Sequence, residues 1–313
     1  MASILIFSER DELAFELLGK AGNLSGPMGL EVAAAVFGPA DPKEYQRRGA
    51  AKVLYSHQEQ MKSFEASVYA QAMVQAARAA DASLILVSST RRGKELAGRL
   101  AQKMKAGCLM DVKSLEFREG RLIGVRNSFG GATEAIQTIL TKIQVIAVVP
   151  RSFEPASADG GGGAIVDLKL DLTPSRVRMV KRSEKDGGAV DIEGAEVLVC
   201  VGKGLAKQED LKMVEELAGA LGGIVACTKP VATDLKWLPE SRMIGLSGKK
   251  GKPGLALCLG ISGQVQFTVG IRDAKIIMAI NTDPNAYIFQ ITDYGMVADL
   301  HQAVPLLAAA LKS

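Results

Sequence analysis

The sequence predicts an α/β protein made of two doubly wound domains, each with a mostly parallel sheet. Short β-rich runs alternate with amphipathic stretches along most of the chain, which is the pattern of a parallel sheet covered by helices on both faces. The chain has 313 residues, too many for one ordinary core but suitable for two. We therefore expect an N-terminal α/β domain over residues 1–186 and a second domain over residues 187–313.

The first domain is expected to begin with a strand and a helix and to continue in alternation. Strands are predicted where apolar and β-branched residues form short runs, and helices where apolar residues recur at helical spacing. The predicted strands are Ser3–Ser8, Val32–Gly38, Lys52–Ser56, Ser83–Ser88, Val112–Glu116, Leu122–Arg126, Val145–Val149, Ile165–Leu170 and Arg176–Lys181. The predicted helices are Glu9–Ala21, Phe64–Ala80 and Lys94–Lys105. A surface excursion is expected at the glycines 160–163 and a hinge at residues 186–188.

The second domain opens with the buried strand Glu196–Val201 and the helix Gln208–Leu221, continues with the strand Gly223–Ala226, and ends with the helix Leu300–Leu311. Polar or glycine-rich turns follow its strands. Each turn alone is as readily structural as functional, and Lys203 could equally point to water. Together they would gather unpaired N–H groups at one sheet edge, which favours a phosphorylated ligand such as a nucleotide cofactor. The turns are Gly202-Lys203-Gly204, Thr228-Lys229, Gly245-Leu246-Ser247-Gly248, Ser262-Gly263-Gln264-Val265-Gln266 and Asn281-Thr282-Asp283.

Composition excludes several classes of protein. Hydrophobic residues make up 48% and charged residues 23% of the chain, which argues against disorder and against a membrane protein. The net charge of +4 comes from scattered Lys and Arg without interleaved aromatic residues, so nucleic acid is not an expected partner. The sequence shows neither a basic leader nor a run of membrane-spanning length, so we expect a cytoplasmic protein without membrane insertion. Four cysteines without CxxC pairing and two histidines predict buried thiols and no metal site.

The order of the motifs resembles the alpha subunit of the electron-transfer flavoproteins. The most specific segment is GISGQVQF followed by AINTDPNAYIFQITDYGMVADL, and a weaker match covers Ser88-Ser89-Thr90, Asp111-Val112 and residues 125–131. The resemblance implies a Rossmann-like C-terminal domain that binds one non-covalent FAD. It also implies a heterodimer with a beta subunit that binds AMP or another FAD, with the first domain supplying the subunit interface. Such a complex carries electrons between a flavin-dependent dehydrogenase and a membrane or soluble electron acceptor.

The resemblance assigns cofactor-binding roles to individual positions. Lys203 and Lys229 stand where the family presents Arg. Lysine keeps the positive charge but lacks the planar guanidinium group, which donates paired hydrogen bonds. Ser247 keeps a hydroxyl that would reach flavin N5, whereas Leu246 lacks an amide. Phe267 stands where the family has a His that faces flavin O2, and Phe cannot donate a hydrogen bond there. The assigned positions are Lys203, Thr228, Lys229, Gly245, Leu246, Ser247, Ser262, Gly263, Gln264, Val265, Gln266, Phe267, Asn281, Asp299 and Leu300, the last three for the adenosine half. Asp299 can equally be an ordinary N-cap of the helix Leu300–Leu311.

Two alternatives stay open on the sequence. One is a subunit of an NAD(P)-dependent oxidoreductase, although the turn at residues 201–204 lacks the full GxGxxG arrangement. The other is a cofactor-free scaffold descended from a flavoprotein, which the residues at Lys203, Lys229, Leu246 and Phe267 make conceivable. No acid–base pair or nucleophile constellation is evident, which favours a redox carrier subunit over a self-sufficient enzyme.

Overall fold

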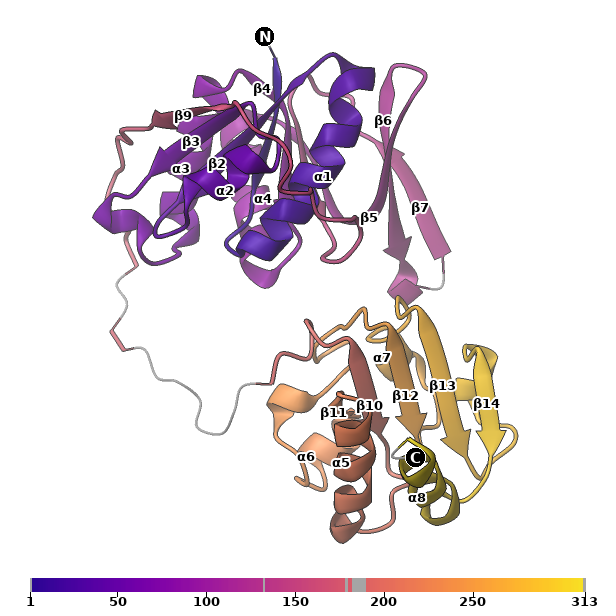
Figure 1. The fold of residues 1–313 in the computed structure, drawn as a ribbon. Helices are drawn as coiled ribbons and strands as arrows, with labels where there is room; N and C mark the ends of the chain where they lie inside the picture. Colours follow the sequence, from indigo (N-terminus) through magenta and orange to yellow (C-terminus); the bar gives the residue numbers. More distant parts are fainter. Residues whose placement is uncertain (1, 132, 178–179, 182–189, 312–313) are drawn as a thin grey trace. The chain divides into compact units, whose positions relative to one another are not determined.

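The computed structural model describes residues 2–131, 133–177, 180–181 and 190–311. The chain divides into two compact units (Figure 1). The first contains residues 1–128 and 132–181, and the second contains residues 129–131 and 182–313. The domain boundary predicted after residue 186 and the predicted hinge at residues 186–188 lie outside the described residues.

The first unit is built on a nine-stranded sheet with the order β7-β6-β5-β8-β4-β1-β2-β3-β9. Its strands are β1 Ser3–Phe7, β2 Glu31–Phe37, β3 Lys52–Ser56, β4 Ala82–Ser88, β5 Gly107–Arg118, β6 Arg121–Ser128, β7 Thr133–Thr138, β8 Gln144–Val148 and β9 Ala164–Asp167. Its helices are α1 Asp11–Met28, α2 Pro42–Arg47, α3 Ala66–Ala79 and α4 Arg91–Met104, with the short 3₁₀ helix η1 at Glu59–Met61.

Alternation along the strands produces two cores in the first unit, one on each face of the sheet. Leu5 of β1 faces the core that α3 and α4 cover, where Met73 and Leu96 are fully buried. Ile4 and Ile6, one residue out of phase, face the core that α1 covers with Leu17. The predicted α/β class with helices on both sheet faces is therefore confirmed.

The first sheet is mixed, and this differs from the prediction in two places. β5, β6 and β7 pair antiparallel. The edge strand β7 was not predicted, because its Thr, Glu and Gln residues show no apolar alternation. The strand predicted at Arg176–Lys181 is wrong for the described residues, which include no strand there. Val177 and Val180 are largely exposed, so nothing buries the β-branched side chains that suggested a strand.

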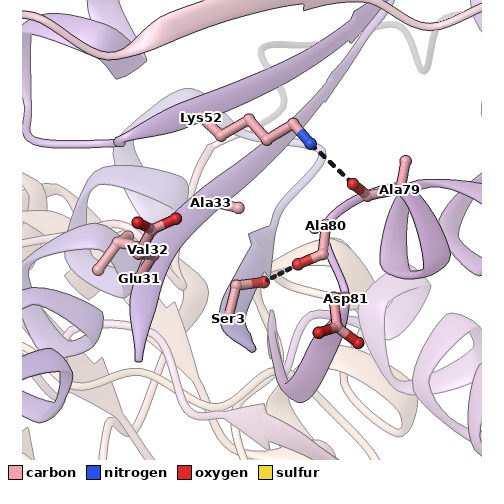
Figure 2. Close-up of a pocket in the computed structure, with 8 residues that line it drawn as sticks. All are labelled: Ser3, Glu31, Val32, Ala33, Lys52, Ala79, Ala80 and Asp81. Atoms are coloured by element: carbon pink, nitrogen blue, oxygen red, sulfur yellow. Dashed lines mark hydrogen bonds between the residues drawn. The ribbon is translucent and has the colours of Figure 1, made fainter. Parts of the chain in front are cut away.

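The amino-terminal edge of the first sheet holds a small cavity of about 150 Å³ (Figure 2). Two side chains there bind the last carbonyl groups of α3. Ser3 Oγ donates to the Ala80 carbonyl at 2.7 Å, and Lys52 Nζ donates to the Ala79 carbonyl at 2.7 Å. A cation is favourable at a helix carboxyl end, so these contacts complete the helix.

The second unit is built on a five-stranded, entirely parallel sheet with the order β11-β10-β12-β13-β14. Its strands are β10 Val197–Val201, β11 Ile224–Cys227, β12 Leu255–Leu259, β13 Ile276–Asn281 and β14 Tyr294–Val297. Its helices are α5 Leu211–Ala220, α6 Lys229–Thr233, α7 Val265–Thr268 and α8 Leu300–Ala310. The short 3₁₀ helices are η2 Phe129–Gly131, η3 Gln208–Asp210, η4 Glu240–Arg242 and η5 Tyr287–Gln290.

Apolar side chains fill both faces of the second sheet. α5 and α8 pack on one face, where Val214 and Val304 join Val199 of β10. On the other face Ile271 and Ile288 pack against Leu198, one residue along the same strand. Three of the four cysteines, Cys200, Cys227 and Cys258, are buried free thiols, as the sequence predicted.

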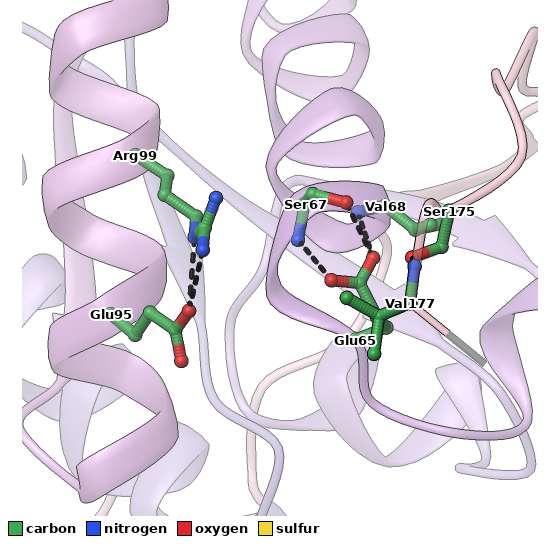
Figure 3. A network of polar contacts seen from close by, with 7 residues as sticks. All are labelled: Glu65, Ser67, Val68, Glu95, Arg99, Ser175 and Val177. Carbon is green, nitrogen blue, oxygen red and sulfur yellow. Dashed lines mark hydrogen bonds and ion pairs between the residues drawn. The ribbon is translucent and has the colours of Figure 1, made fainter. Parts of the chain in front are cut away.

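Glu65 caps the amino end of α3 (Figure 3). Its carboxylate accepts hydrogen bonds from the main-chain N–H groups of Ser67 at 3.1 Å and Val68 at 2.9 Å. Burial alone would raise the pKa of Glu65, but hydrogen bonds from Ser67, Val68 and Ser175 lower it overall. Because folding lowers the pKa of Glu65, the charged carboxylate stabilises the folded protein at pH values above the ordinary carboxyl pKa. This stabilisation is lost as the pH falls through the lowered pKa.

Glu65→Ala is expected to lower the free energy of unfolding by about 1 kcal/mol at neutral pH, the usual effect of losing a helix cap. The loss should shrink as the pH falls through and below the ordinary carboxyl pKa of 4.5. Urea unfolding of the full chain, followed by circular dichroism, measures both. The control is Glu95→Ala, which removes an exposed pair with Arg99 at 2.8 Å and should change stability by less than about 0.5 kcal/mol. Equal losses in the two variants would contradict the capping role.

Candidate functional site

The carboxyl ends of all five strands of the second sheet open into turns at one edge (Figure 1). Because every strand runs parallel, the turns that begin at Gly202, Thr228, Gly260, Asn281 and Ala298 meet there. The strand order reverses direction between β10 and β12, which makes their turns the topological switch point. In open α/β sheets this is where ligands bind.

The turns after β10 and β12 touch through their main chains. Gly202 N–H donates to the Leu259 carbonyl, and Gly204 N–H donates to the Gly260 carbonyl, each at 2.9 Å. A Cβ atom on Gly204 would lie 2.6 Å from Gly260 Cα, and one on Gly202 would lie 2.3 Å from Gly260 O. Only glycine fits at these positions, and Lys203 between them is held exposed at the sheet edge.

The loop from Gly260 to Phe267 is also fixed from the side of β13. Asn281 Nδ2 donates to the Ile261 carbonyl at 2.9 Å, and Ile288 N–H donates to the Ser262 carbonyl at 3.1 Å. A Cβ atom on Gly263 would lie 2.1 Å from Ile288 N, so this position also requires glycine. Asn281, assigned to the adenosine half, uses its side chain to position the loop.

The turn Gly245–Gly248 packs against the same loop. Leu246 N–H donates to the Gln266 carbonyl at 2.7 Å, and a Cβ on Gly245 would lie 2.3 Å from that oxygen. On its other side the chain joins the end of β11, because Ile244 N–H donates to the Cys227 carbonyl at 2.9 Å. Segments predicted separately from sequence are thus brought into one layer of turns.

The centre of this layer presents main-chain donors without acceptors. Within the part of the chain that the structure describes, the N–H groups of Ser262, Gly263, Gln264, Val265 and Gln266 donate to no protein oxygen. Val265 and Gln266 begin α7, where main-chain donors have no partner within the helix, and the three turn residues before them lengthen this run of donors. A run of N–H groups in a turn is suited to bind an anion.

Cationic and hydroxyl side chains lie on the turns of the same sheet edge. Lys203 and Lys229 are exposed and, among the described residues, form no ion pair. Ser247 and Ser262 are also exposed. Both ammonium groups therefore remain available to a bound phosphate or to solvent.

Three assigned apolar residues take different positions. Phe267 is only 6% exposed and lies in the core beneath the loop with Ile244 and Ile271. Leu300 is 5% exposed, and a Cβ on Gly260 would lie 3.1 Å from its Cδ1 atom. Both side chains support the turns from below, whereas Leu246 is 62% exposed beside them.

Two residues that contact each other beside Asp299, His301 and Asp210, were not predicted from the sequence. Asp299 caps α8 by accepting the His301 N–H at 2.7 Å, and His301 Nδ1 lies 3.2 Å from the same oxygen. His301 Nε2 lies 3.0 Å from Asp210 Oδ2. Hydrogen bonds with Asp210 and Asp299 raise the pKa of His301 above its ordinary value. The two-residue spacing of Asp299 and His301 could have predicted their contact. The contact with Asp210 could not be predicted, because Asp210 is 91 residues from His301 in the sequence.

Among the described residues, no group of three or more His, Cys, Asp or Glu side chains is arranged to hold a metal ion. No described helix has the length and apolar character needed to cross a membrane.

Comparison with known proteins identifies the family. Residues 5–173 match the electron transfer flavoprotein domain, and residues 191–272 match the electron transfer flavoprotein FAD-binding domain. YdiR of Escherichia coli K12, an electron transfer flavoprotein subunit by name, is 33% identical over 310 residues, which is 99% of this chain and 98% of YdiR. Protein FixB of Salmonella typhimurium is 31% identical over 313 residues, with 99% of this chain and 98% of FixB covered.

A third relative is the lactate dehydrogenase (NAD⁺, ferredoxin) subunit LctC of Acetobacterium woodii. It is 34% identical over 308 residues, covering 96% of this chain and 73% of LctC. The first match lies within the first unit except for residues 129–131, and the FAD-binding match covers the second unit from β10 to α7, with the turns that begin at Gly202, Thr228 and Gly260. The chain therefore belongs to the electron transfer flavoprotein family, as an alpha-type subunit.

Proposed function

We propose that the second unit binds one FAD without a covalent bond and that the chain, paired with a beta-type subunit, carries electrons from a flavin-dependent dehydrogenase to an electron acceptor. The observation that carries this proposal is the run of unpartnered N–H groups from Ser262 to Gln266 at the carboxyl edge of the parallel sheet. A dinucleotide pyrophosphate supplies the oxygens that such donors lack.

The residues at this edge suit the parts of FAD. The amides of residues 262–266 and the ammonium groups of Lys203 and Lys229 would hold the pyrophosphate and the electron-rich edge of the flavin. The exposed Ser247 hydroxyl would face the ring, and Asp299 would accept hydrogen bonds from the ribose hydroxyls. FAD supplies the capacity to accept and release electrons, while the protein residues bind it, orient it and set its electrostatic surroundings.

Lysine in place of arginine changes how the cofactor is held. An ammonium group is a compact, strongly hydrated charge on a flexible stem, whereas a guanidinium group stacks and donates paired hydrogen bonds. Lys203 and Lys229 therefore contribute charge with less directional control. We infer that the main-chain amides, which the glycine contacts fix in place, carry most of the orientation in this protein.

The proposed partners follow from the family and from the first unit. Ile136 of the edge strand β7 and Leu140 just after it are 74% and 85% exposed, which supports a subunit interface on the first unit. LctC is by name a dehydrogenase subunit, which supports a dehydrogenase as the electron donor. We place this exchange in the cytoplasm, without membrane insertion of this chain and without a nucleic-acid partner.

The complex of this chain with its beta-type subunit is expected to contain one FAD that depends on the alpha-type chain. The visible spectrum of the purified complex, with chromatography of the released cofactor, measures the identity and the count. Release of NAD(P) would favour the alternative of an NAD(P)-dependent subunit. A complex that binds no flavin, even after incubation with FAD, would favour the cofactor-free scaffold and contradict the proposal.

Gly204→Ala is expected to remove that FAD, because the new Cβ would lie 2.6 Å from Gly260 Cα and would push the two turns apart. The number of FAD molecules bound to the complex should fall by one per alpha-type chain. This difference also distinguishes the flavin of the alpha-type chain from any flavin that the beta-type subunit holds. Gly219→Ala in α5 is the matched control, since nothing lies within 4 Å of its Cβ position. That control should bind FAD normally and, with alanine favoured in a helix, gain about 0.5–1 kcal/mol of stability. Normal flavin content in Gly204→Ala would contradict the role of the glycine contact.

A further inference from the structure

His301 links two carboxylates that belong to different elements of the second unit. Its Nε2 atom lies 3.0 Å from Asp210 Oδ2, just before α5, and its Nδ1 atom lies 3.2 Å from Asp299 Oδ1, just before α8. The main-chain N–H of His301 also donates to Asp299 Oδ1 at 2.7 Å. The imidazole and the Asp299 side chain are each about half exposed, so a ligand can reach them.

We propose that His301 is a positioning residue that fixes the Asp299 carboxylate for the ribose of the adenosine half of FAD, and that it makes the affinity for FAD depend on pH. This inference builds on the proposed function, because it concerns the same cofactor. No assignment from the sequence or from the comparisons includes His301 or Asp210.

The geometry of Asp299 explains why a positioning residue matters. One oxygen, Oδ1, accepts both the main-chain N–H and the ring contact of His301, which leaves Oδ2 open to a ligand within the described part of the chain. An exposed carboxylate held by a single bond can still rotate, whereas a second contact fixes its plane. Two ribose hydroxyls require a carboxylate in one orientation, so the second contact prepares the site before the cofactor binds.

The protonation state of His301 decides whether the ring can donate a hydrogen bond to both carboxylates. A neutral imidazole has one N–H donor and can donate to Asp210 or to Asp299, but not to both. The protonated ring has two donors and can bridge them. Asp210 already accepts the Lys207 main-chain N–H at 3.2 Å, so its position is fixed independently of the ring.

The direction of the pH dependence follows from these contacts. The hydrogen bond with Asp210, then that with Asp299 and the charge of both, raise the pKa of His301, and its slight desolvation acts in the opposite direction. The charged groups in contact with the ring are these two carboxylates. The bridge is therefore complete at low pH and is lost as the pH rises through this pKa. The affinity for FAD should fall over the same range.

The test measures FAD affinity of the full complex between pH 5.5 and 8.5 by flavin fluorescence, for the wild type and for His301→Phe, His301→Gln and Asp299→Asn. Wild-type affinity should weaken by roughly threefold across this range, the effect of one exposed charged pair. His301→Phe should bind weakly at every pH. His301→Gln, which keeps a single donor, should match the wild type at high pH and show no pH dependence. His57→Gln alters the other histidine of the chain and should keep the wild-type profile.

The remaining variant separates positioning from simple attraction between a charged His301 and the phosphates. Asp299→Asn should remove the pH dependence, whereas direct attraction would leave it intact and would overturn the inference. A wild-type profile in His301→Phe would also overturn it, while the proposed function would stand. Absence of any FAD binding in the wild-type complex would instead overturn the proposed function, and this inference with it.

A titration of the His301 ring by NMR adds a readout that needs no cofactor. The pKa should lie above the ordinary value of 6.5 in the wild type and should fall in both Asp210→Asn and Asp299→Asn. An unshifted wild-type pKa would show that the ring bridges neither carboxylate and would overturn the inference.

Discussion

Direct main-chain contact between the turns after β10 and β12 is the constraint on which the second unit depends. Gly202 and Gly204 on one turn and Gly260 on the other approach so closely that no side chain fits between them. This contact is possible because the two strands are neighbours in the sheet and run parallel. It positions the start of the loop that continues to Phe267, and two further contacts, from Asn281 and Leu246, fix the rest of that loop.

Because of this contact, the main chain and the side chains contribute differently at this sheet edge. Amides in a fixed loop provide oriented donors, so the side chains around them need only supply charge and polarity. In the proposed function, lysine at positions 203 and 229 then needs to supply charge rather than the directional hydrogen bonds of arginine. Phe267 and Leu300 are buried and hold the turns from below. Their contribution to the site is the shape of the loop above them.

The sequence predicted the parts of the fold in which pattern and burial agree. Apolar runs such as the one around Leu198 mark strands that are buried on both faces, and their ends and the following glycines predicted the layer of turns. β7 was not predicted because it is an exposed edge strand of polar residues. Val177 and Val180 suggested a strand, but both side chains are exposed and the described residues around them form no strand. Within the site, the bridge from His301 to Asp210 depends on a contact across 91 residues, which local pattern cannot reveal.

In the proposed function, the main-chain N–H groups of residues 262–266 hold the pyrophosphate of FAD. A crystal structure of the flavin-loaded complex would decide this. It should show phosphate oxygens within hydrogen-bonding distance of these amides, between the turns that carry Lys203 and Asp299. A pyrophosphate bound elsewhere, with no phosphate oxygen near these amides, would contradict it.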